Sequence, residues 1–420
     1  MMKAIFLLGL LLFGNILHII DRNVMSLFMP AIRDDMMLSA TESGLIISSF
    51  VVVLSIVAIP IARLADTHGP RVVIAGALFV WSAATFLCGS ADGFVSLFGF
   101  RMSVGAGEAG FPPAALAALA LLFPPQQLGR AIAVFTLGAS VGQVLGFYIS
   151  GQVQAELGWR GAFHLLGAIG IGLAAVIWLV WPHCAPKHNV SEATKARPGF
   201  FETFKFLFTI PGYTTILIAA VVHAVSAYAV VQWMPTFLHD YHDMPIEDVG
   251  TYMGLVLSVA GVAGAVVTGF VIDRISLDHK LSRCMYFSSI SVALTVPFYL
   301  GPLLLDDFVT KHALIVAWFL SSVYYAPTYF VLQGMVPVEN RASANAVVLT
   351  SFTVAGLGLG PVMVGAISDF LTSLNVGSSL AWAMSVGASL NLVAAAFFYM
   401  TSKRLKASPP NWEAAAQATP

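Results

Sequence analysis

The feature that most constrains this chain is a series of twelve apolar runs. About twenty apolar residues in a helix cross the roughly 30 Å hydrocarbon layer of a bilayer. Only 10% of the 420 residues are charged and 58% are hydrophobic, whereas a soluble domain has roughly 25% charged residues. We therefore predict an all-α membrane protein, with spans at residues 4–30, 42–63, 71–90, 95–122, 129–153, 161–182, 211–238, 248–272, 282–303, 312–336, 342–370 and 379–402.

Lysine and arginine are distributed unevenly between the two sides of these spans. Of the 20 Lys and Arg residues, fifteen fall in the connections on one side and only Arg33, Arg160 and Lys311 on the other. Connections rich in Lys and Arg stay in the cytoplasm. We expect a multi-pass protein of the cell's inner (plasma) membrane, with both termini cytoplasmic.

The longest polar connection divides the spans into two sets of six. It reads 183-HCAPKHNVSEATKARPGF-200, and similar short turns recur on either side of it. Asp66 and Asp273 are 207 residues apart, and Arg130 and Arg341 are 211 apart. Duplicated halves around a central site are a transporter architecture. We predict an N-terminal six-helix bundle at 1–182, a cytoplasmic linker at 183–210, a C-terminal bundle at 211–402 and a cytoplasmic tail at 403–420.

The fourth span carries two charged residues inside an apolar segment. Arg101 and Glu108 lie seven residues apart, so a helix places them on one face, about 10 Å apart. Glycines surround Glu108, and Pro112-Pro113 follow it, so the helix is expected to bend or break there. Charge at membrane depth is costly and marks a functional site by default. The alternative is a structural pair that only holds helices together.

The first span adds His18, Asp21 and Arg22. Asp21 and Arg101 have similar expected depths, about 13 and 10 Å from the outer ends of their helices, so we expect them to pair. We expect Glu108 and Asp21 to be the proton-coupling residues, because burial and nearby charges act against each other on a buried carboxyl. Glu108 is expected to take up and release a proton, and Asp21 to stay ionised more of the time, as the partner that holds or releases Arg101. His18 is a possible relay, or else an ordinary helix contact.

The second half of the sequence carries aromatic and amide side chains instead. We found no acid or base at mid-membrane there and expect a cavity lined by Tyr228, Gln232, Tyr325, Tyr329 and Gln333. Such a cavity suits a substrate with a polar head, held by Arg22 and Arg101, and an apolar body against aromatic rings. The alternative is that these aromatics only pack between helices or mark the membrane interface.

Several motifs resemble those of the major facilitator superfamily. The turn 62-ARLADTHGPR-71 is similar to its signature loop, with a shorter copy in 269-GFVIDR-274, and 138-GASVGQVLGFYISG-151 is similar to its glycine-rich fifth helix. The spacing of Gly138, Gly142 and Gly146 predicts a ridge of small residues for close helix packing. The pieces 20-IDRNVMS-26, 107-GEAGFPPAA-115 and 157-LGWRGAF-163 resemble the spinster-like group. The resemblance implies a conformational gate at the residues that match the loop motif, which are Asp66, Gly69, Arg71, Arg130, Gly269, Asp273 and Arg274.

The resemblance implies a proton-coupled secondary transporter that moves an amphipathic, lipid-like molecule, such as a lysolipid or sphingoid compound, by alternating access. A proton-coupled organic-anion or metabolite symporter is the first alternative, and a non-transporting membrane receptor on the same scaffold is the second. We expect no enzyme activity, no metal and no cofactor other than protons as the coupling ion. The expected partners are the substrate and the lipid bilayer, with no nucleic acid, and we expect a monomer.

Overall fold

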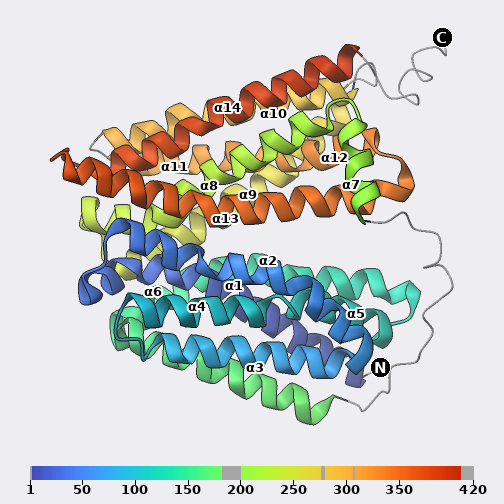
Figure 1. Ribbon diagram of the computed structural model, residues 1–420, viewed down its shortest axis with the longest axis vertical. Coiled ribbons are helices and arrows are strands. Elements are labelled where there is room, and N and C mark those ends of the chain that lie inside the picture. Colours follow the sequence, from blue (N-terminus) through green and yellow to red (C-terminus); the bar gives the residue numbers. More distant parts are fainter. Residues whose placement is uncertain (1, 182–199, 276–279, 306–307, 408–420) are drawn as a thin grey trace. The chain divides into compact units, whose positions relative to one another are not determined.

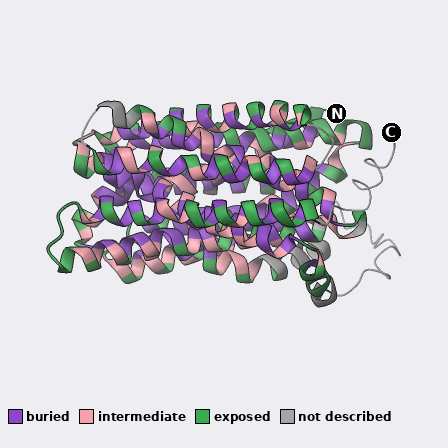
Figure 2. Cartoon of the chain, turned by 90° about the horizontal axis from the view of Figure 1, so that it is seen from above, coloured by how far each residue is buried: buried purple, intermediate pink, exposed green. Residues whose placement is uncertain are grey.

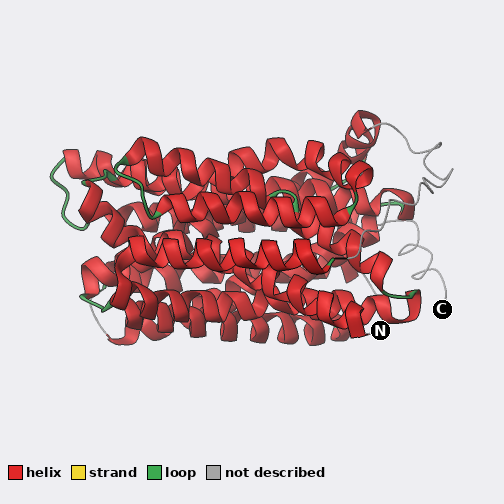
Figure 3. Cartoon of the chain, turned by 90° about the horizontal axis from the view of Figure 1, so that it is seen from below, coloured by secondary structure: helices red, strands yellow, loops and turns green. Residues whose placement is uncertain are grey.

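The computed structural model describes residues 2–181, 200–275, 280–305 and 308–407, and all regular structure in these ranges is helical (Figures 1 and 3). The α-helices are α1 Met2–Met36, α2 Ala40–His68, α3 Pro70–Cys88, α4 Phe94–Glu108, α5 Phe111–Leu122, α6 Pro125–Val180, α7 Phe200–Thr209, α8 Tyr213–His242, α9 Ile246–Arg274, α10 Lys280–Leu304, α11 Phe308–Val323, α12 Tyr325–Met335, α13 Arg341–Ser373 and α14 Ser379–Ala407, and a short 3₁₀ helix, η2, spans Val338–Asn340.

The long helices bury one side and expose apolar side chains on the other. Figure 2 shows buried and exposed residues alternating around each helix. The exposed residues include large apolar ones such as Phe79, Leu179 and Val259, which in water would be costly to leave uncovered. In the described part of the chain, 11 helical segments are long and apolar enough to cross a membrane. The predicted all-α membrane fold is therefore confirmed.

Helix α6 provides two of the predicted spans. It has 56 residues, and Gly158 within it has φ 67°, a left-handed conformation that costs glycine little. Before Gly158 the helix runs parallel to α1, and after it antiparallel to α3, where Gly167 packs on Phe86 and Arg71 contacts Trp178. Since α1 and α3 run in the same direction, the chain reverses at Gly158. The fifth and sixth crossings are the two arms of this hairpin.

The fourth and tenth spans are each divided in two. Residues 109–110 separate α4 from α5, and Tyr324 separates α11 from α12. Pro112-Pro113 lie in the first turn of α5 and Pro327 in the first turn of α12. Proline has no N–H to give to the preceding turn, so the helical hydrogen bonds are interrupted. The break predicted after Glu108 is therefore confirmed, and it has a counterpart in the second half.

The chain folds into two compact units, each with its own hydrophobic core. Unit 1 comprises Met1–His188 together with Gln232–Ser258, and unit 2 comprises Asn189–Val231 and Val259–Pro420. Within unit 1, the segment Gln232–Ser258 packs on α6, where Gly254 lies close to the Val144 carbonyl. The predicted domain boundaries remain a prediction. Most of the predicted linker lies outside the described residues, and α7 occupies its last part.

Both units use the same glycine packing. In unit 1, Gly138, Gly142 and Gly146 of α6 lie against α1, where a Cβ on Gly142 would come within 2.9 Å of the Ile16 carbonyl. In unit 2, Gly356 and Gly360 of α13 lie against α8, and a Cβ on Gly360 would come within 2.8 Å of a backbone nitrogen. Small residues let backbones approach closely. The packing predicted for the fifth span is confirmed, and its repetition agrees with a duplicated unit.

Candidate functional site

One face of α1 carries three ionisable residues. Asp21 and Arg22 follow His18 by three and four residues, so each lies one helical turn from it on the same side of the helix. His18 and Asp21 are buried, while the Arg22 side chain is 26% exposed. Their partners lie on helices α3 and α4. At this depth a charged group needs a partner, because lipid and apolar side chains offer none.

Asp21 is held by α3 and α4. The Thr85 hydroxyl donates a hydrogen bond of 2.7 Å to one carboxylate oxygen of Asp21, and the Arg101 guanidinium donates one of 3.0 Å to the other. Arg101 is fully buried. Hydrogen bonds between charged partners are the strong ones, so this contact ties α1 to α4. The predicted pairing of Asp21 with Arg101 is confirmed, whereas Thr85 was not predicted.

Glu108 pairs with the next residue of α1. The Arg22 Nε donates to Oε2 of Glu108 at 2.9 Å, and the His18 Nε2 lies 3.4 Å from the same oxygen. The second oxygen of Glu108 has no hydrogen-bond partner among the described residues. Two neighbouring residues of α1 therefore bind two residues of α4 that lie two turns apart. With two carboxylates and two arginines the charges balance, which is what a low-dielectric interior tolerates.

Phe50 of α2 lies beside both arginines. The guanidinium carbons of Arg22 and Arg101 are each 5.4 Å from the centre of its ring, within the range of a cation–π interaction. A side chain on Gly105 would collide with the Phe50 backbone, so the glycine allows α4 to lie this close to α2. Sequence reasoning missed Phe50, because an aromatic residue in an apolar span gives no signal of its neighbours.

The residues of the signature loop are close to helix ends. Helix α2 continues through Asp66 to His68, so Asp66 lies in a helix rather than in the predicted turn, and its side chain is outside the described part. Gly69 precedes α3 with φ 79°, a backbone conformation that favours glycine. Arg71 donates a hydrogen bond of 3.0 Å to the Trp178 carbonyl and lies over its ring. Arg71 therefore links α3 to α6 within unit 1.

The other motif residues make fewer contacts. Arg130 is exposed near the start of α6. In the second copy of the motif, Gly269 is partly buried and Asp273 and Arg274 are exposed at the end of α9. The guanidinium of Arg274 lies over the Phe270 ring, one turn back on the same helix. The gating role of all these residues remains a prediction.

The predicted cavity residues of the second half belong to an aromatic cluster. The rings of Tyr325 and Tyr329 are 4.6 Å apart. Tyr324 lies beside Tyr325 and stacks on Phe352, which in turn contacts Tyr228 at 5.9 Å. The cluster thus connects α8, α12 and α13 within unit 2. Tyr325 is 50% exposed, so the cluster reaches from the core to the surface of its unit.

The two predicted amide residues have no recorded ring contact with this cluster, and one of them belongs to the other unit. Gln333 is exposed on α12. Gln232 is buried, and it lies in the part of α8 that belongs to unit 1. The structure therefore brings three of the five predicted cavity residues, the tyrosines, into one cluster. The role of all five as a substrate cavity remains a prediction.

The expectation that the second half lacks an acid or base at membrane depth is wrong. His223 of α8 is 1% exposed, and its Nδ1 lies 2.9 Å from the Asn391 side-chain oxygen. Its Nε2 lies 3.3 Å from the Ser321 hydroxyl, and Asn391 donates to Thr295 at 2.8 Å. The Tyr324 ring lies 4.1 Å from the imidazole. A lone histidine is a weak signal, but its spacing of 205 residues from His18 is close to the repeat.

Comparisons with known proteins agree with this architecture. Residues 11–328 match the profile of the Major Facilitator Superfamily. An MFS-type efflux pump of Mycolicibacterium smegmatis is 28% identical over 95% of this chain and 92% of the pump. A hexuronate transporter of Bacillus subtilis is 26% identical over 91% of this chain and 92% of that transporter. The fold is similar to the crystal structure of a bacterial homologue of the human lysosomal transporter spinster, in an inward-facing and unoccupied conformation. The TM-score is 0.85 at 22% identity, and the match covers 96% of this chain and 97% of the homologue.

The profile covers most of the chain, including the paired charges of α1 and α4 and the first copy of the loop motif. The fold agrees with that of the spinster homologue over nearly the whole length. Transport in this superfamily needs no bound cofactor. The chain therefore belongs to the Major Facilitator Superfamily and is a multi-pass membrane transporter of small molecules, not an enzyme.

Proposed function

We propose that this transporter couples movement of its substrate to protons at Glu108 and Asp21. The proposal depends on one observation: two buried carboxyls, Glu108 and Asp21, pair with the partly buried Arg22 at 2.9 Å and the buried Arg101 at 3.0 Å. A cluster of this kind is expensive to bury, and intramembrane ionisable residues of transporters often act as proton relays. The competing explanation is that the pairs serve only to hold α1 against α4.

Protonation changes which partners the arginines can keep. A proton on Glu108 removes the charge that binds Arg22, and a proton on Asp21 does the same for Arg101. A freed arginine can bind the anionic group of a substrate or return to its carboxylate. If the protein alternates between inward-open and outward-open states, the proton is loaded on one side and released on the other. His18, 3.4 Å from Glu108, is placed to relay the proton.

An amphipathic, lipid-like substrate of the lysolipid or sphingoid type is our first proposal. Of the five ionisable side chains in the cluster, Arg22 is the most exposed, so it is the one best able to meet a polar head group. Tyr228, Tyr325 and Tyr329 would contact an apolar body. The spinster homologue is similar in fold and the M. smegmatis efflux pump in sequence, and the lipid-like class itself is what the resemblance of the motifs to the spinster-like group implies.

An organic-anion symporter is the second proposal. The B. subtilis relative, of similar coverage, is a hexuronate transporter, and a small carboxylate would also pair with Arg22. The two proposals differ in what the aromatic cluster does. Replacing Tyr325 and Tyr329 with Ala should weaken binding of a lipid-like substrate strongly and leave binding of a small organic acid almost unchanged.

The orientation and the loop motif complete the proposal. We propose that both termini face the cytoplasm of the cell, that the protein works as a monomer, and that Asp66, Arg71 and the matching residues of the second copy bias the conformational equilibrium. For the orientation, cysteine introduced by Ala193→Cys should react with an impermeant reagent only after cell lysis. Labelling in intact cells would overturn the orientation.

The transport proposal is tested in liposomes with purified protein. A pH-sensitive dye inside the vesicles reports proton movement while candidates from both classes, lysolipids, sphingoid bases, hexuronates and other organic acids, are added outside. We expect a substrate of one class to cause proton flux, and a pH step to accumulate that substrate. Transport of any substrate without proton movement, and without a response to a pH step, would contradict proton coupling.

A further inference from the structure

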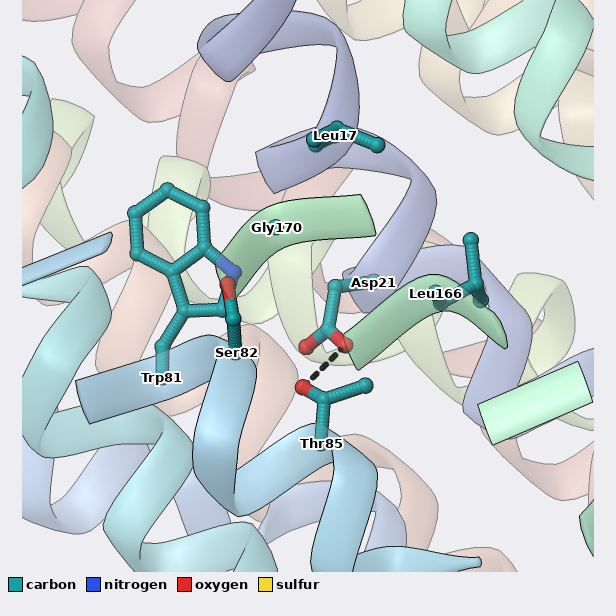
Figure 4. A pocket seen from close by; sticks show the side chains of 7 residues that line it. All are labelled: Leu17, Asp21, Trp81, Ser82, Thr85, Leu166 and Gly170. Carbon is teal, nitrogen blue, oxygen red and sulfur yellow. Dashed lines mark hydrogen bonds between the residues drawn. The ribbon is translucent and has the colours of Figure 1, made fainter. Parts of the chain in front are cut away.

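A small cavity lies beside the Asp21 carboxyl in unit 1, between α1, α3 and the second arm of α6. Leu17, Asp21, Trp81, Ser82, Thr85, Leu166 and Gly170 line it (Figure 4). Its size corresponds to about one water molecule. Figure 4 shows the lining side chains: the Asp21 carboxyl, which is joined to the Thr85 hydroxyl, the Ser82 hydroxyl, the Trp81 indole and the apolar Leu17 and Leu166.

The Ser82 hydroxyl gives this cavity an unpaired polar group. Ser82 is 1% exposed, and its oxygen has no hydrogen-bond partner among the described residues. Buried hydroxyls nearly always have a partner, because an unpaired one is costly. A side chain on Gly170 would lie almost on this hydroxyl, so the glycine leaves the room that the hydroxyl and a small ligand need.

A water molecule fits this chemistry better than a metal cation does. The lining offers three side-chain groups with oxygen, whereas Ca²⁺ and Mg²⁺ take six or more oxygen ligands. The Arg101 guanidinium, 3.0 Å from the Asp21 carboxyl, also repels a second positive charge. Water can donate to the carboxyl and accept from Ser82, and two to four polar partners are what a buried water normally has.

We propose that this cavity holds one water molecule between Asp21 and Ser82, and that this water accepts the hydrogen bond of Asp21 when the carboxyl is protonated. The second part rests on the proposed proton coupling. A protonated carboxyl needs an acceptor, and Arg101 has only donors. The Thr85 hydroxyl donates to Asp21, so a water in the cavity is the acceptor that leaves this hydrogen bond in place. The site therefore gives Asp21 a state in which it holds a proton and releases Arg101.

The other ionisable groups near Asp21 are few. They are Arg101 and Glu108 on α4, Cys88 on α3, and His18 and Arg22 on its own helix. The second arm of α6 contributes Leu166 and Gly170, which carry no charge. Any pH response of the cavity must therefore be separated from that of Glu108 by testing both carboxyls.

An exchange of two residues tests the site. In Ser82→Gly/Gly170→Ala, the new methyl group occupies much of the space of the Ser82 side chain, since a Cβ at 170 would lie 2.7 Å from the Ser82 Cβ but 3.9 Å from its Cα. The volume is kept and the hydroxyl is lost. Gly172→Ala on the same arm is the matched control, because a Cβ there meets nothing within 4 Å. Thermal unfolding in detergent checks that each variant folds.

Infrared difference spectra between high and low pH report protonated carboxyls directly. We expect the purified protein to show a carbonyl band that shifts in heavy water and that is lost in Asp21→Asn/Arg101→Gln, a double variant that removes both charges. In the exchange variant this band should move to higher frequency, and the pH midpoint of transport should shift by about one unit, a tenfold change in proton concentration. Gly172→Ala should match the natural protein.

Three results would overturn the inference. The first is a band that is unchanged in the exchange variant. The second is a spectrum of Asp21→Asn/Arg101→Gln that keeps every protonated-carboxyl band of the natural protein. The third is loss of transport when choline replaces Na⁺ at equal ionic strength, because a cation rather than water would then be the ligand. Proton flux in the natural protein is measured separately, so loss of the proposed coupling would be distinguished from failure of this site.

Discussion

The two units contain equivalent buried clusters with different chemistry. His18 of α1 and His223 of α8 are 205 residues apart, and each lies on the first membrane helix of its six-span set. Each also lies beside a helix break, at Glu108 for His18 and at Tyr324 for His223. Around His18 the partners are charged, whereas around His223 they are Asn391, Ser321 and Tyr324.

The difference indicates that the two units share an architecture but that their buried clusters have different functions. The glycine packing and the broken helix occur in both units, so these features belong to the architecture. The carboxylates and arginines occur only in the unit 1 cluster, among the described residues. A neutral network positions helices without responding to protons, while a charged one can change partners when a proton binds. We therefore expect mutations in the first cluster to alter coupling and those in the second to alter stability.

The largest effect is expected from Asp21→Asn. It leaves Arg101 fully buried without its counter-charge, which costs about 3–5 kcal/mol for a buried pair. Unfolding by heat or denaturant in detergent should show this loss, and substrate binding and transport should both fail. The double variant Asp21→Asn/Arg101→Gln should recover much of the stability but not the transport. Equal stability of the single variant and the natural protein would mean that the pair contributes little.

A smaller effect is expected in the second cluster. His223→Leu removes the partner of the Asn391 side-chain oxygen and leaves that buried oxygen unpaired, at a cost of about 1–3 kcal/mol. His223→Gln keeps a hydrogen-bonding side chain and should cost less. Neither variant should move the pH midpoint of transport, whereas His18→Gln should. A shift of that midpoint in His223→Gln would show that the second cluster also takes part in coupling.

The smallest effect is expected at the loop motif, where the two copies also allow a comparison. Asp66→Asn should lower the turnover of transport a few-fold and leave substrate affinity almost unchanged, because the motif biases a conformational equilibrium. Asp273→Asn in the second copy, at an exposed position at the end of α9, is the matched variant. Initial rates over a range of substrate concentrations separate the two quantities. Unchanged turnover in both variants would make the motif an ordinary helix end.

Much of the architecture could be predicted because membrane solvation imposes simple rules. Apolar length gave the spans, Pro112-Pro113 gave the break after Glu108, and the glycine spacing gave the close packing of α6 on α1. The pairing of Asp21 with Arg101 followed from depth alone, since charges at one level in an apolar layer have few other partners. The membership of the superfamily followed from the motifs.

The details of the site depend on helix rotation, which the sequence does not reveal. Depth could not show that Arg22 rather than Arg101 binds Glu108, because both choices bring opposite charges together. Phe50 and Thr85 carry no charge, so nothing in their spans set them apart. His223 was overlooked as a single polar residue, although its spacing from His18 could have identified it. The cavity at Ser82 arises from three helices meeting, and no local pattern encodes it.

The most direct test of the account compares Glu108→Gln with His223→Gln in liposomes. Glu108→Gln keeps the shape and hydrogen bonding of the side chain but cannot exchange a proton. After a pH step, the natural protein and His223→Gln should accumulate substrate against its gradient, while Glu108→Gln should bind substrate without accumulating it. Accumulation by the Glu108→Gln protein at the natural rate would contradict the assignment of proton coupling to the first cluster.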